Sequence, residues 1–448
     1  MSNGKKTLAQ EFSVLFNLPW YIFAIFAGIV LVAAYMGVLP QGMAGCFAFM
    51  IVLGTVLGKA GDNCPIIKDY LGGGAIVIIF GSAALNFFKV IPEGVVTNIT
   101  SFFKPTGAFL DFYIAALITG SILGMNRKLL VKAAARYFPA IFGGLGLAFL
   151  LCSVLGQIMG FGWVKALLLI ALPIMGGGMG AGATPLSKIF ESSGTMTADE
   201  ALSIMTPAVA IGNAISIVIA GIIVKIIVDK KWNGQGTLMQ SGTVDPAELE
   251  ISPEMQAKRD DLKISYMGVG LFVSTAFFAW GYIVSKVWGM LVPSVSIHAY
   301  AWMIITVAIC KITNCLPESI EIACYQWFQF IMKNLTNTLL VGIGICYLDL
   351  NQVIASLNLT YLVLCAVTCL GAFFGAALVG KLVGFYPVEA GITAGLCMSN
   401  MGGTGDVAVL SAADRMELMP FAQISSRLGG AVILLLGSLM LSLMAGML

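Results

Sequence analysis

The sequence predicts an all-α polytopic membrane protein with about eleven transmembrane helices and two re-entrant hairpins in an inverted repeat. Three observations predict it: an apolar composition, a series of long apolar runs, and two glycine-rich interruptions at matching positions. Of the 448 residues, 59% are hydrophobic and 10% are charged, whereas a soluble domain carries about 25% charged residues. A soluble core of this size could not bury so much apolar surface, so the surplus must face a lipid bilayer.

The predicted spans are apolar runs of about 20 residues, the length needed to cross a bilayer. They lie near residues 17–37, 41–58, 73–91, 107–124, 137–159, 204–229, 264–286, 297–313, 333–349, 360–380 and 420–446. Two further apolar runs, 166–190 and 389–412, are interrupted by glycines. Because broken backbone is tolerated at membrane depth only against protein or water, we expect both runs to be re-entrant hairpins.

The distribution of basic residues predicts which loops are cytoplasmic. Lys5 and Lys6 place the N-terminus inside, and the basic loops 126–137 and 230–262 then also fall inside. The loops 92–106 and 350–359 fall outside and contain only Lys104. This agreement requires each interrupted run to return to the side from which it entered, and it places the C-terminus outside. The net charge of +2 gives no indication of nucleic-acid binding.

The two halves of the chain resemble each other at an offset of about 225 residues, with Gly177–Gly178 falling on Gly402–Gly403. The predicted topology gives the halves opposite orientations. The expected organisation is an N-terminal tail with an extra first helix, a first repeat, a cytoplasmic linker and a second repeat, at residues 1–37, 38–229, 230–262 and 263–448.

The interruptions Gly176–Gly182 and Gly402–Gly405 are expected to line the binding site of a transported solute. Glycine lets the backbone bend sharply and approach a ligand. Freed carbonyl groups can coordinate a cation, and N–H groups at the start of a helix can hold an anion. Tight helix packing through small residues is the structural alternative. A nucleotide-binding loop is a weaker alternative, because it would need a preceding strand and the context here is a membrane run.

Polar side chains cluster around the second interruption: Ser399, Asn400, Thr404, Asp406 and Ser411. Carboxylate, amide, hydroxyl and carbonyl oxygens suit a small hard cation, with sodium favoured and a proton as the alternative. Asp406 is therefore an ion ligand, a proton carrier or a helix cap. Glu389, just before this interruption, is interpreted as lying at the membrane interface.

Arg427 is the sharpest single candidate, because a charged side chain within a span usually faces a pathway. Its guanidinium could bind an organic carboxylate in a two-pronged fork, and a topology-fixing arginine that reaches the interface is the alternative. Arg415 is interpreted as a solvated pair with Asp414. Asn213 is a mid-span candidate ligand of substrate or ion. With His298 as its only histidine, the chain has no conventional catalytic set, so an enzyme is not expected.

The resemblance of the chain to a known family rests on four motifs: GGGMGAGATPLS, AGLCMSNMGGTGDVAVLSAADRM, AQISSRLGGA and IHAYAWM. They are similar to those of the bacterial 2-hydroxycarboxylate transporter family, the group of sodium–citrate symporters and malate carriers. The resemblance covers nearly the whole chain. It implies a homodimer in the bacterial inner membrane, with a dimerisation scaffold and a mobile transport domain that moves like an elevator. It also implies symport of a small organic anion with Na+.

The resemblance assigns binding roles residue by residue. By motif, Asn400, Thr404 and Ser426 are similar to ion or substrate ligands, and Arg427 to the family's carboxylate-binding arginine. With the glycine chemistry above, the candidate substrate-binding residues are Gly178, Met179, Gly180, Asn400, Gly402, Gly403, Thr404, Ser426 and Arg427. The candidate sodium ligands are Gly178, Gly182, Met398, Ser399, Asn400, Thr404, Ser425 and Ser426.

Met401 is the one departure from the family pattern. The citrate symporters of this family carry a second arginine directly after the asparagine, as Asn-Arg-Gly-Gly. A tricarboxylate would lose a charged hydrogen bond worth about 1.5–3 kcal/mol. The sequence therefore favours malate or another C4 2-hydroxydicarboxylate over citrate. A citrate symporter or a 2-hydroxycarboxylate exchanger is the alternative within the family, and a channel or structural membrane protein is the alternative outside it.

Overall fold

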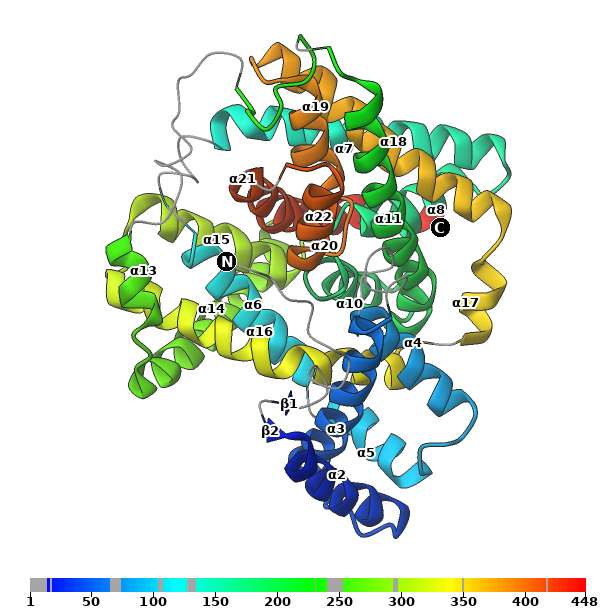
Figure 1. Cartoon of the computed structure of the whole chain (residues 1–448), viewed down its shortest axis with the longest axis vertical. Coiled ribbons are helices and arrows are strands. Elements are labelled where there is room, and N and C mark those ends of the chain that lie inside the picture. Colours follow the sequence, from blue (N-terminus) through cyan, green and yellow to red (C-terminus); the bar gives the residue numbers. More distant parts are fainter. Residues whose placement is uncertain are drawn as a thin grey trace. The chain divides into compact units, whose positions relative to one another are not determined.

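The computed structural model describes residues 14–448 apart from 17, 65–73, 104–107, 126, 128–133, 230, 240–252, 293–296, 349 and 416–417. The described chain is mainly helical (Figure 1). It divides into two compact units, each assembled from separate stretches of sequence. The first comprises Met1–Tyr113 and Lys333–Asn351, and the second comprises Ile114–Met332 and Gln352–Leu448.

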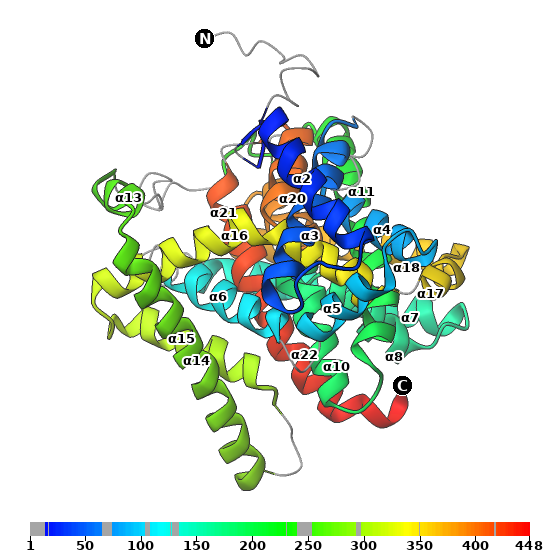
Figure 2. The same cartoon turned by 90° about the horizontal axis from the view of Figure 1, so that it is seen from below.

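The first unit is built around α3. A short pair of strands, β1 (Val14–Leu15) and β2 (Leu18–Pro19), precedes the helices. The helices are α2 (Trp20–Tyr35), α3 (Met43–Asp62), α4 (Gly74–Phe87) and α5 (Glu93–Phe103), and the unit also takes the start of α6 (Phe109–Leu123) and the end of α16 (Glu318–Cys346). Helix α3 packs against α2, α4 and α5, and these helices lie together in Figure 1 and Figure 2.

An aromatic cluster forms the core of the first unit. Phe47, Phe102 and Phe109 pack with ring centroids 4.9–5.4 Å apart, and Phe103 joins them. The ring of Phe103 reaches α16 at Gly342, where a Cβ atom would lie 1.9 Å from it. Glycine at this position therefore lets α16 close over the aromatic core.

The second unit contains both glycine-rich interruptions. Its first half contains α7 (Ala134–Ile158), α8 (Trp163–Ala166), η3 (Leu167–Ala171), α9 (Leu172–Ile174), η4 (Met179–Ala183), α10 (Thr184–Ser192) and α11 (Ala198–Ile226). Then follow α13 (Pro253–Asp260), α14 (Ile264–Leu291) and α15 (Ala299–Thr313). Its second half contains α17 (Leu350–Ser356), α18 (Leu359–Leu382), α19 (Pro387–Ala390), η5 (Gly391–Leu396), α20 (Gly403–Ala412), α21 (Met419–Ile424), η7 (Ser425–Gly429), α22 (Gly430–Met444) and η8 (Ala445–Met447).

Helices α7 and α18 form the most extensive helix pair of this unit (Figure 1). Glycines let their backbones approach closely. A Cβ atom at Gly375 would lie 2.1 Å from the Gly143 carbonyl oxygen, and one at Gly371 would lie 2.7 Å from the Ala148 Cα atom. Small residues of this kind allow close van der Waals packing, which drives helix association in lipid because the hydrophobic effect does not act there.

The element order repeats along the second unit. Helix α18 corresponds to α7, and the π-helical turn η5 corresponds to η3, at the offset of about 225 residues found in the sequence. In each copy a long helix is followed by a short helix, a π-helical turn, a glycine-rich break and another helix; the first copy has in addition α9 before the break and η4 after it. The π-helical turns cluster at the breaks and at the start of the last helix, the kind of position where such turns mark functional sites.

Among the described residues each predicted span overlaps helical structure, and the last one, 420–446, is divided into α21, η7, α22 and the start of η8. In the described part of the chain, six helices are long and apolar enough to cross a membrane: Met43–Asp62, Tyr137–Ile158, Ala198–Ile226, Ile264–Leu291, Leu359–Leu382 and Gly430–Met447. The prediction of an all-helical polytopic protein is confirmed at this level. Its boundaries differ most at α16, which begins at Glu318 rather than near 333. A hydropathy search does not detect the start of α16, because its first turn contains the charged residues Glu318 and Glu321. In the structure Glu318 pairs with Lys258 and Glu321 pairs with Lys311, each at 2.7 Å.

Candidate functional site

The two glycine-rich breaks touch each other through their backbones. Gly178 has a φ of +105°, and a Cβ atom there would lie 2.8 Å from the carbonyl carbon and oxygen of Met401. At Gly402 (φ +79°) a Cβ atom would lie 3.0 Å from the Gly177 oxygen, and at Gly177 (φ +76°) it would lie 2.7 Å from the Ser426 oxygen. Only glycine tolerates both these dihedral angles and these contacts. The first break, the second break and the start of the last helix therefore meet at one place.

A buried carboxylate lies in the second break. Asp406, in the first turn of α20, is fully buried, as is Asn400. The Asn400 Nδ2 atom donates to Asp406 Oδ1 at 2.9 Å, and Ser426 Oγ lies 2.6 Å from Asp406 Oδ2. The Cys397 carbonyl oxygen is 3.1 Å from the same hydroxyl. These residues, here called the polar cluster (Cys397, Asn400, Asp406 and Ser426), join both sides of the break to η7.

The turn within the break is held by its own hydrogen bonds. Asn400 Oδ1 accepts from the Gly402 N–H at 2.7 Å, and the Gly402 oxygen accepts from the Asp406 N–H at 2.8 Å. The Asn400 amide is thus oriented on both sides: its oxygen faces the turn and its nitrogen faces the carboxylate. Such preorganisation keeps the oxygen atoms of the polar cluster in place.

Helix α11 brings a second set of polar side chains to the break. Asn213 Oδ1 accepts from the Met401 N–H at 3.1 Å, and Ser216 Oγ lies 2.8 Å from Ser399 Oγ. Because the oxygen of the Asn213 amide faces Met401, its nitrogen points elsewhere, and it has no hydrogen-bond partner among the described residues. A buried donor of this kind is costly unless something binds it, so Asn213 is available to a ligand.

The chemistry of the polar cluster fits a small hard cation. It gathers carboxylate, hydroxyl, amide and backbone carbonyl oxygens, the ligands that such ions prefer. The cluster supplies one negative charge from Asp406 in a buried environment, where electrostatic interactions are stronger than in water. Residues that could hold Na+ are therefore Asp406, Ser426, Asn400 and the Cys397 carbonyl.

The structure brings together many of the residues predicted from the sequence. The breaks and η7 bring together Asn400, Ser426, Gly178 and Gly402. Ser399 lies next to Asn400 in the chain, and its hydroxyl contacts that of Ser216. Ser425 Oγ lies 2.9 Å from the Tyr137 hydroxyl, on the neighbouring face of η7.

Other predicted residues have packing roles in the structure. Gly182 lets the two ends of the first break approach each other, since a Cβ atom at Gly182 would lie 2.4 Å from the Gly176 oxygen. The fully buried Met398 side chain lies against Gly429, and Met179 is also buried. The surroundings of Gly180 and Gly403 and the side chains of Thr404, Ser411 and Arg427 lie outside the described residues.

One prediction near the second break is wrong, and one residue has partners that the sequence did not indicate. The side chain of Glu389, predicted at the membrane interface, is fully buried in the protein and accepts hydrogen bonds from the N–H groups of Gly234 and Gly236. Arg415 was expected to form a solvated pair with Asp414. Its side chain is only 13% exposed, and its Nε atom lies 3.5 Å from Glu389 Oε1. Asp414 contributes its backbone oxygen instead, at 2.8 Å from Arg415 Nη1.

Sequence reasoning missed Ser216 and Tyr137. Ser216 stands three residues after Asn213, so both share one face of α11. That spacing is a signal that could have found Ser216. Tyr137 is a single aromatic residue near the start of α7, and the sequence carries no mark of its contact with Ser425.

The sequence matches the model of the 2-hydroxycarboxylate transporter family over residues 15–439. It is 37% identical to the malate transporter MleP of Lactococcus lactis subsp. lactis, over 95% of this chain and 96% of that protein. It is 37% identical to the citrate transporter CitP of Leuconostoc mesenteroides subsp. mesenteroides, over 94% of this chain and 92% of that protein. It is 36% identical to the citrate/sodium symporter of Salmonella typhimurium, over 95% of this chain and 94% of that protein.

Proposed function

Because the chain belongs to the 2-hydroxycarboxylate transporter family, we propose that it takes up a malate-like 2-hydroxydicarboxylate together with Na+. It is a multi-pass membrane protein, and its relatives are transporters rather than enzymes. These relatives carry the names of malate transporters, citrate transporters and citrate/sodium symporters.

The buried carboxylate of Asp406 is the observation that carries sodium coupling. It accepts from Asn400 and Ser426 and shares the Ser426 hydroxyl with the Cys397 carbonyl. A bound Na+ would balance the charge of the carboxylate and take lone pairs from the surrounding oxygens. A proton on Asp406 is the alternative coupling ion, and the protonated carboxyl group would need one hydrogen-bond acceptor rather than several oxygen ligands.

Met401 and Arg427 support the proposed substrate. Arg427 lies in η7 beside Ser426, at the start of the last helix, and a guanidinium binds carboxylate bidentately. Met401 lies at the contact between the two breaks, where the citrate symporters of the family carry a second arginine. One arginine suits a dicarboxylate better than a tricarboxylate. A citrate symporter or an exchanger of 2-hydroxycarboxylates is the second candidate, because relatives with both substrate names are equally similar.

The proposed mechanism places both breaks at the tips of re-entrant hairpins within a mobile transport domain. Solute and ion would bind where the hairpins and the last helix meet, and the domain would carry them across by an elevator-like movement within a homodimer. The repeated element order of the second unit supports this arrangement, because secondary transporters with inverted repeats bind their cargo at the repeat interface. The proposed orientation has a cytoplasmic N-terminus and an external C-terminus, in the bacterial inner membrane.

Thermal unfolding of the purified protein tests ion binding directly. A ligand that binds only the folded state stabilises it by an amount that grows with the logarithm of its concentration. The midpoint should rise with NaCl but not with choline chloride at equal ionic strength, and Asp406→Asn should remove the rise. Equal stabilisation by both salts would contradict a sodium site.

A further inference from the structure

The chain leaves α11 and folds onto the start of the second broken segment. Two backbone hydrogen bonds join them: Val388 N–H donates to the Trp232 oxygen at 3.0 Å, and Tyr386 N–H donates to the Leu238 oxygen at 2.8 Å. The Lys381 ammonium group lies 3.8 Å from the centre of the Trp232 ring. The first residues of the linker are thus packed against the segment that enters α19.

The loop Asn233–Gly236 presents two N–H groups to one carboxylate. Gly234 N–H donates to Glu389 Oε2 at 2.8 Å, and Gly236 N–H donates to Oε1 at 3.3 Å. Gly236 has a φ of +99°, and Gln235, with a φ of +50°, donates its N–H to Asn233 Oδ1 at 3.0 Å. Successive N–H groups in such a turn form a concave site for an anion. Here the anion is the fully buried Glu389.

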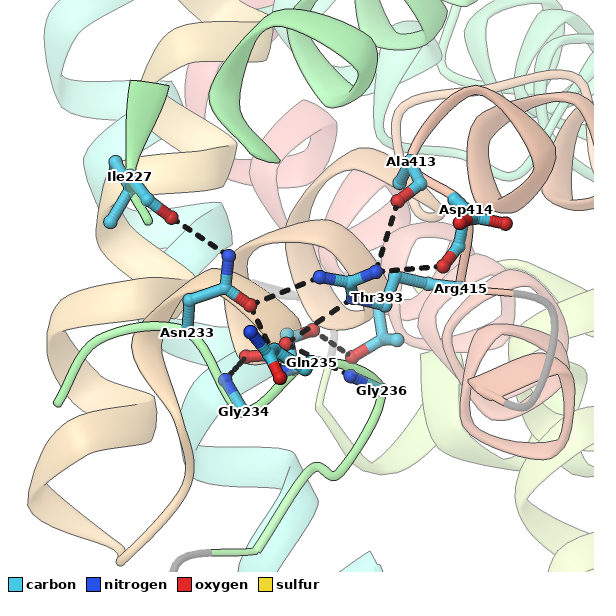
Figure 3. Close-up of polar contacts among 10 residues, drawn as sticks. Ile227, Asn233, Gly234, Gln235, Gly236, Thr393, Ala413, Asp414 and Arg415 are labelled. Carbon is cyan, nitrogen blue, oxygen red and sulfur yellow. Dashed lines mark hydrogen bonds and ion pairs between the residues drawn. The ribbon is translucent and has the colours of Figure 1, made fainter. Parts of the chain in front are cut away.

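Arg415 connects the same loop to the other end of the broken segment (Figure 3). Its Nη2 atom donates to Asn233 Oδ1 at 3.1 Å, and its Nε atom lies 3.5 Å from Glu389 Oε1. Asn233 is fixed in turn, because its Nδ2 atom donates to the Ile227 oxygen at 2.7 Å. Figure 3 shows Asn233 between Ile227 on one side and Arg415 on the other. Arg415 itself follows α20, and its N–H donates to the Leu410 oxygen at 2.8 Å.

We propose that Asn233, Gly234, Gly236, Glu389 and Arg415 form a clasp that positions the polar cluster. Glu389 lies in α19, which leads through η5 to Cys397 and Asn400. Arg415 lies just beyond α20, whose first turn carries Asp406. The clasp therefore holds together the two ends of the segment whose middle contains the ion ligands. Its effect on ion affinity rests on the proposed function, whereas its effect on the geometry of the break does not.

The clasp differs from an ordinary surface ion pair in burial and in the number of partners. An exposed pair contributes little, because water and salt screen its charges. The exposed fraction of the Glu389 side chain is 0% and that of Arg415 is 13%. Neutralising Glu389 would leave two glycine N–H groups and a buried guanidinium without their anion, so the ends of the broken segment would separate.

Three single variants separate positioning from general damage. Glu389→Gln removes the charge but keeps the shape and one oxygen acceptor. Arg415→Lys keeps the charge but cannot bridge Asn233 and Glu389 with a planar fork, and it serves as the milder variant if Glu389→Gln folds poorly. Glu318→Gln is the matched control, since it removes an ion pair with Lys258 in which both side chains are about half exposed.

Hydrogen–deuterium exchange of the full-length protein, with NaCl or with choline chloride, gives a readout independent of transport. We expect faster exchange of residues 397–406 in Glu389→Gln and Arg415→Lys in either salt, and no change in Glu318→Gln. Exchange identical to wild type in both clasp variants would overturn the clasp. If NaCl slows the exchange of these residues in none of the proteins, the proposed sodium coupling fails. The clasp is then tested only by the difference in exchange between the variants and the wild type.

The same variants in proteoliposomes complete the test. A positioning role predicts an increase of about tenfold, within the usual range of coupling between sites, in the Na+ concentration for half-maximal uptake. The maximal rate should change less. A lower maximal rate with an unchanged Na+ requirement, together with normal exchange of 397–406, would reduce Glu389 and Arg415 to a structural ion pair and overturn the proposal.

Discussion

Asn400 donates a hydrogen bond to Asp406 across 2.9 Å, from one side of the second glycine-rich break to the other. The bond closes the turn between the two residues, and the Ser426 hydroxyl lies 2.7 Å from the same carboxylate oxygen and 2.6 Å from the other. The bond places a negative charge at the point where both breaks and the start of the last helix meet.

Asp406→Asn should weaken the binding of sodium. The variant keeps the size of the side chain but replaces a charged acceptor by a neutral one. Charged hydrogen bonds contribute about 1.5–3 kcal/mol, so the apparent sodium affinity should fall by roughly 10- to 100-fold. A sodium titration of uptake measures this shift. The exposed neighbour Asp414→Asn is the control and should leave the titration unchanged.

Met401→Arg should shift the preference of the protein towards citrate. The side chain of Met401 is not needed to hold the turn, because its backbone N–H makes the contact with Asn213. A new guanidinium should improve citrate uptake relative to malate uptake by roughly 10- to 100-fold, the value of one charged hydrogen bond. Competition between the two labelled acids measures the ratio. An unchanged ratio would remove Met401 from the argument about substrate.

Gly177→Ala should stop transport, whereas Gly194→Ala should not. The two glycines have similar φ angles, +76° and +71°, so both substitutions carry a backbone strain of about 1–2 kcal/mol. Only at Gly177 does the new Cβ atom meet a neighbour, the Ser426 oxygen at 2.7 Å. Thermal unfolding should show a loss of stability for both variants, and a larger loss for Gly177→Ala because of this contact. Equal transport by both variants would mean that contact between the first break and η7 is not required.

Arg427→Ala should abolish uptake while leaving the protein folded and its oligomeric state unchanged. The prediction follows from the bidentate binding of carboxylate by guanidinium. Arg427→Lys keeps a positive charge and should retain partial activity with a raised KM. Near-normal transport by Arg427→Ala, measured beside its size-exclusion profile, would return this residue to a topological role.

Hydropathy predicted the long helices because each of them is one continuous apolar run of sequence. It missed α5 and α17, which lie in the stretches 92–106 and 350–359 that were expected to be external loops. Helix α5 has only 11 residues, with Val95, Ile99 and Phe102 buried on one face. A search for spans of about 20 apolar residues cannot detect so short an amphipathic helix.

The candidate site could be predicted as far as its residues are consecutive. The motif around Asn400 and its glycines predicted the second break, and the internal repeat paired the second break with the first. Contacts between distant segments could not be predicted. Arg415 was assigned to its neighbour Asp414, yet Asp414 has a φ of +54° and faces solvent, while Arg415 turns towards Glu389. A single sequence gives charges and spacing, but the pairing of buried charges depends on how the chain closes.

Uptake of labelled malate into proteoliposomes tests the central claim most directly. An inward sodium gradient should drive accumulation of malate above its external concentration, with citrate a poorer substrate, and a potassium gradient should not. Collapse of the sodium gradient should release the accumulated malate. Malate uptake that only equilibrates, or that is equally fast without sodium, would contradict sodium-coupled symport, and preferred accumulation of citrate would contradict the substrate inferred from Met401.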